Sequence, residues 1–238
     1  MDEWRILTWN VQGSRGFDLD FIRTHIVERG ATIVVVQEIQ RRQAQRLADV
    51  LRMEHQWARK HTPLPRFSEG LAIFARDPIS SWSVEVITSA APWSWRRRIV
   101  VGATVTSADG VPIRFLNVHL SAHAAADRRA RELATVAAMN ARARLDVIAG
   151  DFNADLNTMP NAAGPGHHDA SPAGPPTCWA PGPRVGRPPA TRLDGIFVNE
   201  PWVYGPASTP TTDLDRWAKV SDHLPVDVNV SRRDWSRR

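Results

Sequence analysis

The sequence has a single cysteine, few lysines and no long apolar run. Cys178 has no second cysteine with which to form an intramolecular disulfide, so no disulfide framework requires an oxidising compartment. No apolar stretch approaches the roughly 20 residues that a bilayer-spanning helix needs. Residues 1–5 carry neither the basic nor the apolar region of a signal peptide. We therefore expect a cytoplasmic, monomeric protein without a membrane span.

Basic residues exceed acidic ones, and nearly all of the excess is arginine. The chain of 238 residues has 30 Lys+Arg against 25 Asp+Glu, a formal charge of +5. Guanidinium groups bind phosphate through two parallel hydrogen bonds, which favours an anionic partner such as nucleic acid. Arginine-rich, lysine-poor usage can also reflect genomic composition alone, so the charge leaves the partner open.

Hydrophobic periodicity predicts an α/β fold. In the first third, residues 4–11 and 31–36 have the pattern of strands, and 18–29 and 41–53 that of helices. The later predicted elements are a helix at 124–143 and strands at 70–76, 82–88, 99–106, 112–120, 145–149, 193–198 and 225–230.

The segment from 154 to 192 is dense in proline and glycine, which predicts a long surface loop of the kind that often borders a site. No repeat and no composition boundary divides the chain. We therefore expect a single domain over residues 1–230, followed by a basic tail over residues 231–238.

Polar residues recur at the carboxyl ends of apolar strands, where sheet enzymes place their sites. Asn10, Glu38 and His119 each end one strand, and Asp151 and Asn153 follow another. Each has a structural explanation when taken alone. Asn10 can form a turn, Glu38 can place a favourable charge at the start of a helix, and His119 can be a hydrogen-bonded structural histidine. Asp151 and Asn153 can form an Asx turn. Four strand ends that carry this set together favour one shared site.

Six short motifs run in order along nearly the whole chain. They are Thr8-Trp9-Asn10-Val11, Gln37-Glu38, Asn117-Val118-His119-Leu120, Gly150-Asp151-Phe152-Asn153-Ala154, Arg192-Leu193-Asp194 and Ser221-Asp222-His223-Leu224-Pro225. The series resembles that of the endonuclease/exonuclease/phosphatase superfamily, in its deoxyribonuclease I-like branch. The resemblance implies a four-layer α/β sandwich of two mixed β-sheets flanked by helices, with the site at the rim between the sheets.

The resemblance also implies a role for each motif residue. Glu38 would offer a hard carboxylate to Mg²⁺ or Mn²⁺, with Asn10 and Asp222 as neighbouring ligands or water holders. His223 resembles the general base, and Asp194 resembles the carboxylate that fixes its tautomer.

Further roles follow from the same resemblance. Asp151 and Asn153 resemble the residues that orient the attacking water and the phosphoryl oxygen, so hydrolysis would be direct and in-line. His119 resembles the histidine that acts near the scissile phosphate in the deoxyribonuclease and sphingomyelinase branches. Glu69 resembles the acid that partners this histidine, although a solvated loop charge is the alternative.

Three residues are expected to contact substrate: Phe67, Arg97 and Arg98. The two arginines lie where deoxyribonuclease-like proteins carry phosphate-contacting arginine, and Trp93 and Trp95 nearby add stacking surfaces. The alternative is an exposed basic edge that blocks sheet-to-sheet aggregation. Cys178 and the histidines at 123, 167 and 168 match no motif, so we expect a structural cysteine and surface histidines.

The leading hypothesis is a divalent-metal-dependent phosphodiesterase, an endonuclease that hydrolyses nucleic acid by direct water attack. Gln12 and Gln40 stand where deoxyribonuclease-like enzymes tend to carry arginines, which leaves duplex DNA open as the substrate. The alternatives are hydrolysis of a small phosphoester, nucleotide or phospholipid head group, and a non-catalytic binding module. The intact Glu38, Asp151 and His223 argue against the binding module.

Overall fold

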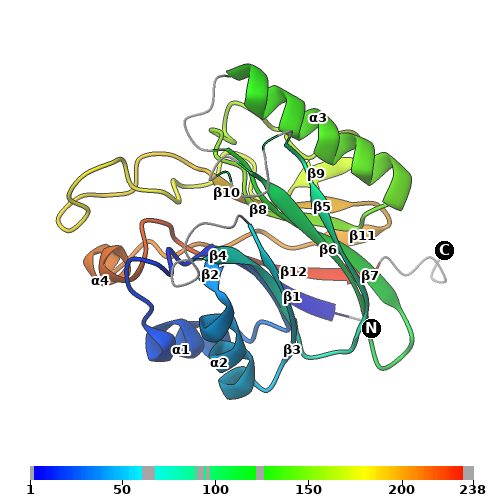
Figure 1. Ribbon diagram of the computed structural model, residues 1–238, viewed down its shortest axis with the longest axis horizontal. Coiled ribbons are helices and arrows are strands. Elements are labelled where there is room, and N and C mark those ends of the chain that lie inside the picture. Colours follow the sequence, from blue (N-terminus) through cyan, green and yellow to red (C-terminus); the bar gives the residue numbers. More distant parts are fainter. Residues whose placement is uncertain are drawn as a thin grey trace.

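Two six-stranded sheets face each other, and helices cover their outer faces (Figure 1). The computed structural model describes residues 3–60, 68–88, 90, 94, 97–121 and 126–232. Helices α1 (Leu19–Glu28) and α2 (Arg41–Leu51) lie outside one sheet, and α3 (Ala126–Ala143) lies outside the other. The predicted four-layer sandwich of two mixed sheets is therefore confirmed.

The first sheet has the order β11-β12-β1-β2-β4-β3, and the second has the order β5-β6-β7-β8-β10-β9. The strands of the first sheet are β1 (Glu3–Asn10), β2 (Ile33–Gln40), β3 (Glu54–Arg59), β4 (Glu69–Ala75), β11 (Trp202–Tyr204) and β12 (Val226–Arg232). Those of the second are β5 (Ile79–Val86), β6 (Ile99–Thr106), β7 (Pro112–His119), β8 (Val147–Asp151), β9 (His167–Asp169) and β10 (Asp194–Asn199). A short helix, α4 (Leu214–Val220), precedes the last strand.

Each sheet contains one parallel pair of strands joined by a helical crossover. β1 pairs in parallel with β2 after α1, and β7 pairs in parallel with β8 after α3. Parallel neighbours end at the same edge of a sheet. The last residues of β1 and β2 therefore lie side by side, as do those of β7 and β8. The two edges face each other across the sandwich and provide the place for a site.

The core has three apolar layers, and a small polar contact crosses the central one. Branched and aromatic side chains from both sheets fill the space between them. Near the carboxyl ends, the Gln37 side-chain amide donates to Asn117 Oδ1 at 2.8 Å, and Asn117 Nδ2 donates to the carbonyls of Val36 (3.1 Å) and Ala72 (2.9 Å). Buried amides satisfied in this way fix the position of one sheet relative to the other.

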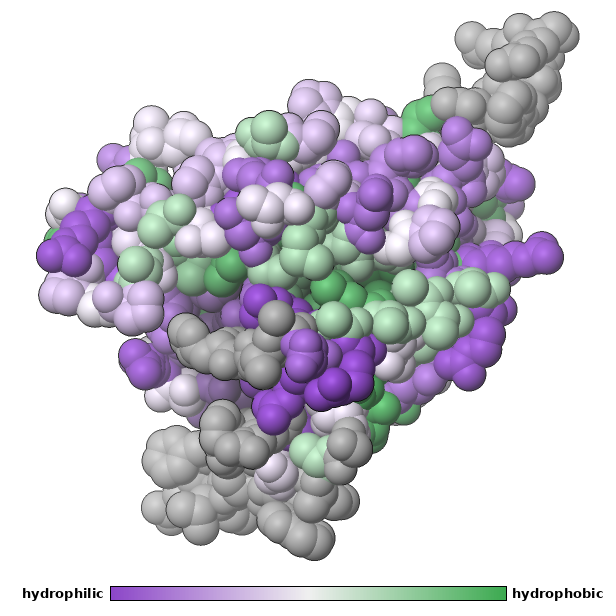
Figure 2. Space-filling model, turned by 90° about the horizontal axis from the view of Figure 1, so that it is seen from above, coloured by the Kyte–Doolittle hydropathy of each residue, from purple (hydrophilic) through white to green (hydrophobic). Residues whose placement is uncertain are grey.

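Most predicted elements are present, with ends shifted by a few residues. The structure adds β3, β9, β11 and α4, none of which the periodicity indicated. β9 interrupts the segment 154–192 that was expected to be a loop throughout. In the described part of the chain, no helix is both long and apolar enough to cross a membrane. The face seen in Figure 2 is largely hydrophilic, with hydrophobic residues in a narrower band near its middle.

Candidate active site

A cleft of about 850 Å³ opens where the two sheets present their carboxyl ends. β1 and β2 of the first sheet and β7 and β8 of the second each contribute a polar end residue to it. Asp222 and His223 come from the segment before β12, and Asn153 follows β8. Seven of the predicted site residues line this cleft: Asn10, Glu38, His119, Asp151, Asn153, Asp222 and His223. Asp194, an eighth, lies buried beneath them.

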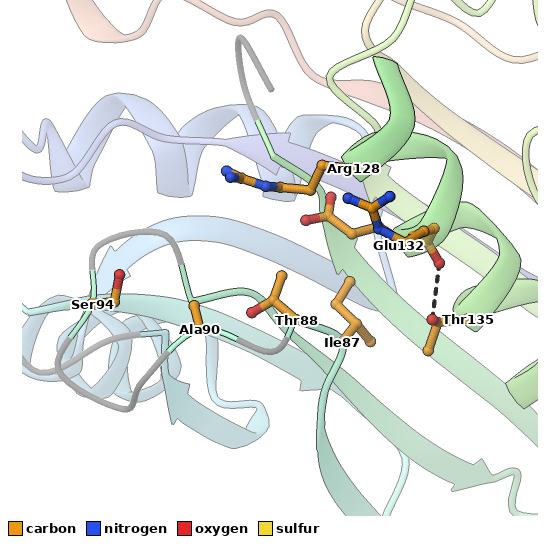
Figure 3. Close-up of a pocket in the computed structure, with 8 residues that line it drawn as sticks. Ile87, Thr88, Ala90, Ser94, Arg128, Glu132 and Thr135 are labelled. Carbon is orange, nitrogen blue, oxygen red and sulfur yellow. Dashed lines mark hydrogen bonds between the residues drawn. The ribbon is translucent and has the colours of Figure 1, made fainter. Parts of the chain in front are cut away.

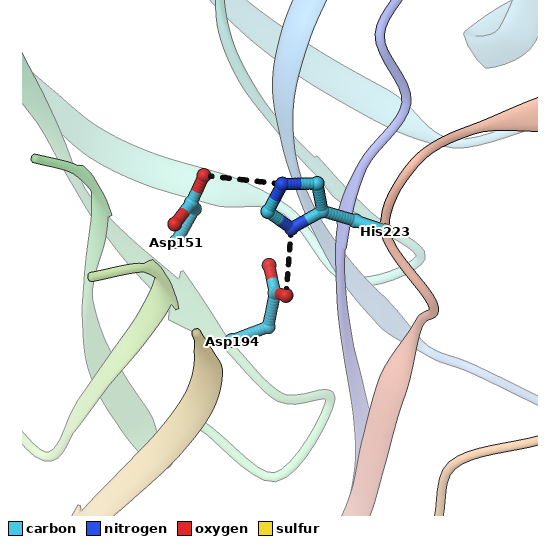
Figure 4. A group of neighbouring side chains, drawn as sticks. All are labelled: Asp151, Asp194 and His223. Atoms are coloured by element: carbon cyan, nitrogen blue, oxygen red, sulfur yellow. Dashed lines mark hydrogen bonds and ion pairs between the residues drawn. The ribbon is translucent and has the colours of Figure 1, made fainter. Parts of the chain in front are cut away.

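His223 is held by a buried carboxylate (Figure 4). Its Nδ1 lies 2.8 Å from Asp194 Oδ2, and the Thr177 hydroxyl donates to the same oxygen at 2.6 Å. Because a carboxylate accepts, Nδ1 carries the proton and Nε2 is left facing the cleft. The backbone of His223 is fixed as well, since its carbonyl accepts from the Trp9 indole at 2.9 Å and its N–H donates to Ser221 Oγ at 3.1 Å.

Asp151 lies at the centre of the cluster and accepts from two amides. Asn10 Nδ2 donates to its Oδ2 at 3.1 Å, and Asn153 donates to both oxygens, through its backbone N–H (2.9 Å) and its side chain (3.2 Å). The same Oδ2 lies 3.6 Å from His119 Nε2 and 3.8 Å from His223 Nε2. Two imidazoles from different sheets therefore converge on one carboxylate.

Burial and charge shift the proton equilibria of this cluster. Burial raises the pKa of Asp151, and the His223 charge opposes that rise. Burial alone would lower the pKa of His223, but the carboxylates of Asp194 and Asp151 outweigh it and raise that pKa well above its ordinary value. The two carboxylates therefore stabilise the positive charge that His223 acquires when it accepts a proton.

Three of the non-glycine residues with left-handed backbones lie in the cleft: Gln12 (φ +46°), Glu38 (φ +55°) and Asn153 (φ +49°). Such conformations are uncommon for residues with a side chain and cluster at functional sites. At Glu38 the irregularity coincides with a shift in the β2–β4 register, which turns the carboxylate out of the ladder and into the cleft.

The oxygens in the cleft fit a hard divalent cation. Asn10, Glu38 and Asp222 present amide and carboxylate oxygens, the donors that Mg²⁺ and Mn²⁺ prefer. A second set, Asp151, Asp194 and His223, places its ligand atoms within 4.8 Å of one another. The second set includes an imidazole nitrogen, whereas Asn10, Glu38 and Asp222 can offer oxygens alone, so the set that includes Glu38 is the better fit for a hard cation.

A model of the endonuclease/exonuclease/phosphatase family matches residues 7–223. The chain belongs to this family. This match confirms the resemblance that the motifs indicated. Members of the family are phosphoester hydrolases. No curated protein matches the sequence closely enough to count as a relative.

Solved structures with the same fold are numerous, and three illustrate the range. A family protein from Bacteroides vulgatus has a TM-score of 0.77 at 16% identity, covering 98% of this chain and 100% of that one. The human Nocturnin catalytic domain with bound sulfate has 0.72 at 16%, covering 97% and 95%. A mannosyl-6-phosphatase from Bacteroides thetaiotaomicron has 0.70 at 17%, covering 96% and 99%. At these identities the likeness shows the fold.

Lys60 is a site residue that sequence reasoning missed. It follows β3, is 5% exposed, and places Nζ 3.4 Å from His119 Nδ1 and 4.0 Å from Glu38 Oε1. Burial and Arg98 lower its pKa to about 8, against the opposing charges of Glu38, Glu69 and Asp151. None of the family motifs includes Lys60, and the hydrophobic periodicity did not predict β3, the strand that it follows.

Glu69 does not pair with His119 as the family resemblance implied. Its carboxylate accepts from the Ser14 backbone N–H at 3.1 Å, and among the described residues no hydrogen bond or ion pair joins it to His119. Lys60 faces Nδ1 of that histidine instead. Burial and the charge of Glu38 raise the pKa of Glu69, so it remains part of the electrostatic surroundings of the site.

The two predicted substrate arginines donate hydrogen bonds to backbone carbonyls. Arg97 Nη1 donates to the carbonyls of Arg59 (3.2 Å) and Lys60 (3.0 Å), and Arg98 is 6% exposed. In this structure Arg97 therefore supports the backbone that carries Lys60, and its contact with substrate stays a prediction. Phe67, Trp93 and Trp95 lie outside the described residues.

Cys178, which was expected to be a structural cysteine, lies in the cleft. Its Sγ is 3.4 Å from His223 Nε2, and burial raises the pKa of the thiol. His167 also differs from expectation: it is buried and hydrogen-bonded to Asn140 at 2.9 Å. His168 is exposed as expected, and position 123 lies outside the described residues.

The proline-rich loop forms one wall of the cleft. Arg184 Nη1 donates to Gln12 Oε1 at 2.9 Å, and Gln12 Nε2 donates to Asp222 Oδ2 at 2.8 Å. A chain of two hydrogen bonds therefore links the loop to a predicted metal ligand. Arg184 and the exposed Arg15 both line the cleft and add positive charge to it.

A second hollow, of about 560 Å³, lies between α3 and the residues Ile87, Thr88, Ala90 and Ser94 (Figure 3). Arg128 and Glu132 project toward it from the helix. Glu132 accepts from the backbone and hydroxyl of Ser121 at 2.8 and 2.6 Å, which holds the chain just after His119. This hollow contains none of the clustered site residues, and its polar contacts support the position of the β7 end.

Proposed function

We propose that the chain is a divalent-metal-dependent phosphodiesterase that hydrolyses nucleic acid by direct attack of water. The observation that carries this proposal is the convergence of Glu38, Asp151 and His223, which come from three distant parts of the sequence, in one cleft. These residues supply a cation ligand, an acceptor for the attacking water and a general base. A binding module has no need for such a set.

The chain's own residues divide the reaction between them. His223 Nε2 accepts a proton from the attacking water, and Asp194 stabilises the imidazolium that results. Asp151 orients the water, while the amides of Asn10 and Asn153 fix Asp151. A cation held by Glu38, with Asn10 and Asp222, would neutralise phosphate charge and stabilise the leaving oxygen.

The charge of the cleft favours a substrate with more than one phosphate. Arg15 and Arg184 line the same cleft as the reacting groups, and neither is needed for chemistry at the scissile phosphate. Each can bind a flanking phosphate, as in a polynucleotide strand. A small phosphomonoester would leave Arg15 without a phosphate to bind.

The direct test is cleavage of single- and double-stranded DNA and RNA oligonucleotides by purified protein with Mg²⁺ or Mn²⁺. We expect cation-dependent cleavage that His223→Ala reduces at least about 100-fold. His168→Ala, which alters an exposed histidine away from the cleft, is the matched control and should retain full activity. Cleavage that does not exceed the His223→Ala background would contradict the nuclease proposal.

A small phosphoester is the second candidate. Two observations favour it: the fold is shared with a mannosyl-6-phosphatase, and the guanidinium groups of Arg97 and Arg98 donate to backbone carbonyls of this chain. Release of phosphate from sugar phosphates or nucleotides, without cleavage of oligonucleotides, would select it. Competition distinguishes the two as well, because a true oligonucleotide substrate inhibits sugar phosphate turnover at low concentration and in a salt-dependent way.

A further inference from the structure

Lys60 is the one lysine that the fold buries. The sequence has only two lysines among its 30 basic residues, and the other, Lys219, is exposed on α4. Lys60 is 5% exposed, and its backbone is held on both sides: its N–H donates to the Glu69 carbonyl at 3.1 Å, and its own carbonyl accepts from Arg97 at 3.0 Å. The position of Nζ is therefore set by the fold.

The closest described partner of Nζ is a ring nitrogen. It lies 3.4 Å from His119 Nδ1 and 4.0 Å from Glu38 Oε1, so the imidazole is nearer than the carboxylate. An ammonium group has three donors and no acceptor. The His119 nitrogen that faces it must therefore accept, and the ring proton is left on Nε2.

The other side of the His119 ring faces the reacting groups. Nε2 lies 3.6 Å from Asp151 Oδ2 and 3.7 Å from Glu38 Oε1, and His119 lines the cleft in which the phosphoryl group would bind. A donor that points into this space can bind a phosphoryl oxygen and stabilise the charge that develops on it.

We propose that Lys60 is a positioning residue that holds His119 as the Nε2–H tautomer, so that His119 serves as a hydrogen-bond donor to a phosphoryl oxygen and not as an acid–base group. A carboxylate at Nδ1, as the family resemblance implied for Glu69, would place the proton on Nδ1 and leave Nε2 free to exchange protons. Because Lys60 is a donor and stands at Nδ1 in place of a carboxylate acceptor, Nδ1 accepts a hydrogen bond and Nε2 donates one. This inference rests on the proposed hydrolysis for its purpose, and on geometry alone for the tautomer.

The tautomer can be read without turnover. Protein labelled with ¹⁵N in histidine gives a long-range ¹H–¹⁵N correlation spectrum in which each imidazole shows which nitrogen carries the proton. The protein has eight histidines. The signals of His119 are identified as those that are present in the wild-type spectrum and lost in the spectrum of His119→Gln. We expect wild-type His119 to show the Nε2–H pattern, and Lys60→Met to lose it in favour of a mixture or a protonated ring.

Two control variants isolate the effect. Lys219→Met makes the same change at the exposed lysine and should leave the His119 pattern intact. Lys60→Arg keeps a donor without an acceptor, so it should preserve the Nε2–H pattern where it folds. Methionine matches the length of lysine and suits a buried position, which allows Lys60→Met to fold.

Activity gives a second, separate result. We expect Lys60→Met to lower kcat by about 10- to 100-fold with a smaller change in KM, because a donor to the transition state is misdirected. In a His119→Gln background the Lys60→Met change should add almost nothing, since both act through one ring. Full additivity of the two changes would overturn the inference.

The outcomes separate this inference from the proposed function. A wild-type His119 that carries its proton on Nδ1, or a pattern unaltered in Lys60→Met, overturns the tautomer assignment whatever the substrate. Absence of hydrolysis with every phosphoester would contradict the proposed function while the spectrum still reported the His119 tautomer.

Discussion

The imidazole of His223 depends on a single buried acceptor. Asp194 is 0% exposed and its Oδ2 receives both the Thr177 hydroxyl and His223 Nδ1. An amide in its place could present its NH₂ group to Nδ1, which would reverse the tautomer and put the ring proton on Nε2. The general base would then be lost without removal of the histidine itself.

We therefore predict that Asp194→Asn lowers kcat by about 10²- to 10⁴-fold with little change in folding. Steady-state hydrolysis of the best oligonucleotide substrate measures it. Asp213→Asn, at an exposed carboxylate that caps no N–H of α4, makes the same chemical change away from the cleft and should keep wild-type activity. Retention of more than about a tenth of kcat in Asp194→Asn would remove His223 from the role of base.

His25 makes the protein sensitive to mild acid. Its ring packs edge-on against Trp217 (centroids 4.7 Å apart) and Trp9 (6.0 Å), and burial together with Arg29 lowers its pKa from 6.5 to about 4. The folded pKa lies below the unfolded one, so the unfolded chain binds the extra proton between these two values. The stability contribution is complete above pH 6.5 and is lost as the pH falls toward 4.

The expected result is a free energy of unfolding that falls by as much as about 3 kcal/mol between pH 7 and pH 4.5 through His25. His25→Phe keeps the aromatic contacts and removes the proton, so its loss over the same range should be smaller. Urea unfolding at both pH values measures the difference. His168→Phe, at an exposed position, is the control, and equal pH dependence in wild type and His25→Phe would contradict the explanation.

The parallel pair β7 and β8 can approach closely only because of Gly150. At this residue φ is +146°, and a Cβ would lie 2.0 Å from the Val118 carbonyl oxygen across the ladder. Neither the backbone conformation nor the space admits a side chain. Since the same strands end in His119 and Asp151, the glycine sets the distance between two site residues.

Gly150→Ala should therefore lower the free energy of unfolding by at least about 3 kcal/mol. Gly186→Ala is the matched control: its φ is also positive, at +77°, but nothing lies within 4 Å of the added methyl group. It should lose only about 1–2 kcal/mol from the backbone conformation. Chemical denaturation of both variants compares them, and equal losses would show that contact with Val118 is unimportant.

The strands that carry the site could be predicted from the sequence because their hydrophobic pattern is strong. β2 and β8 are buried apolar runs with a polar residue at the carboxyl end, and both were predicted within a few residues. β3 was not predicted, because its half-buried side chains show no clear alternation. Lys60 stands directly after β3 and was missed with it.

Long-range partners were harder to predict than strand ends. The pairing of Asp194 with His223 followed from the family motifs and is present at 2.8 Å. The neighbour of His119 could not be deduced from the motifs, because it depends on how the end of β3, which carries Lys60, is placed relative to the cleft. The family resemblance assigned Glu69 to His119, whereas the fold brings Lys60 to that ring. Cys178 was unassigned for the same reason, since only the folded loop places its sulfur beside His223.

The site joins the two halves of the sandwich. Asn10 and Glu38 come from the first sheet, whereas His119 and Asp151 come from the second, and their distances depend on how the sheets pack. The buried amides of Gln37 and Asn117 fix that packing directly beneath the cleft. Carboxylates from both sheets are thereby held together, and burial raises the pKa of Asp151.

Binding of a divalent cation should relieve this concentration of acidic groups and stabilise the whole fold. A ligand that binds only the folded state at 100 times its Kd contributes about 2.7 kcal/mol, which corresponds to a rise in Tm of about 5–10 °C for a chain of this size. We expect such a rise with Mg²⁺ or Mn²⁺ in thermal unfolding, relative to sodium chloride at equal ionic strength. Protons compete for the same carboxylates, so the rise should be smaller at pH 6 than at pH 8.

Glu38→Gln should abolish most of this thermal shift, because it removes the charge of a proposed ligand whose side chain is 23% exposed in the cleft. Asp213→Asn also removes one negative charge, but outside the cleft, and should leave the shift unchanged. An equal shift in Glu38→Gln would mean that the cation binds elsewhere, with Asp151, Asp194 and His223 as the competing site. In that case, Asp194→Asn would lower both the thermal shift and kcat, whereas a ligand set that includes Glu38 predicts that Asp194→Asn lowers kcat alone.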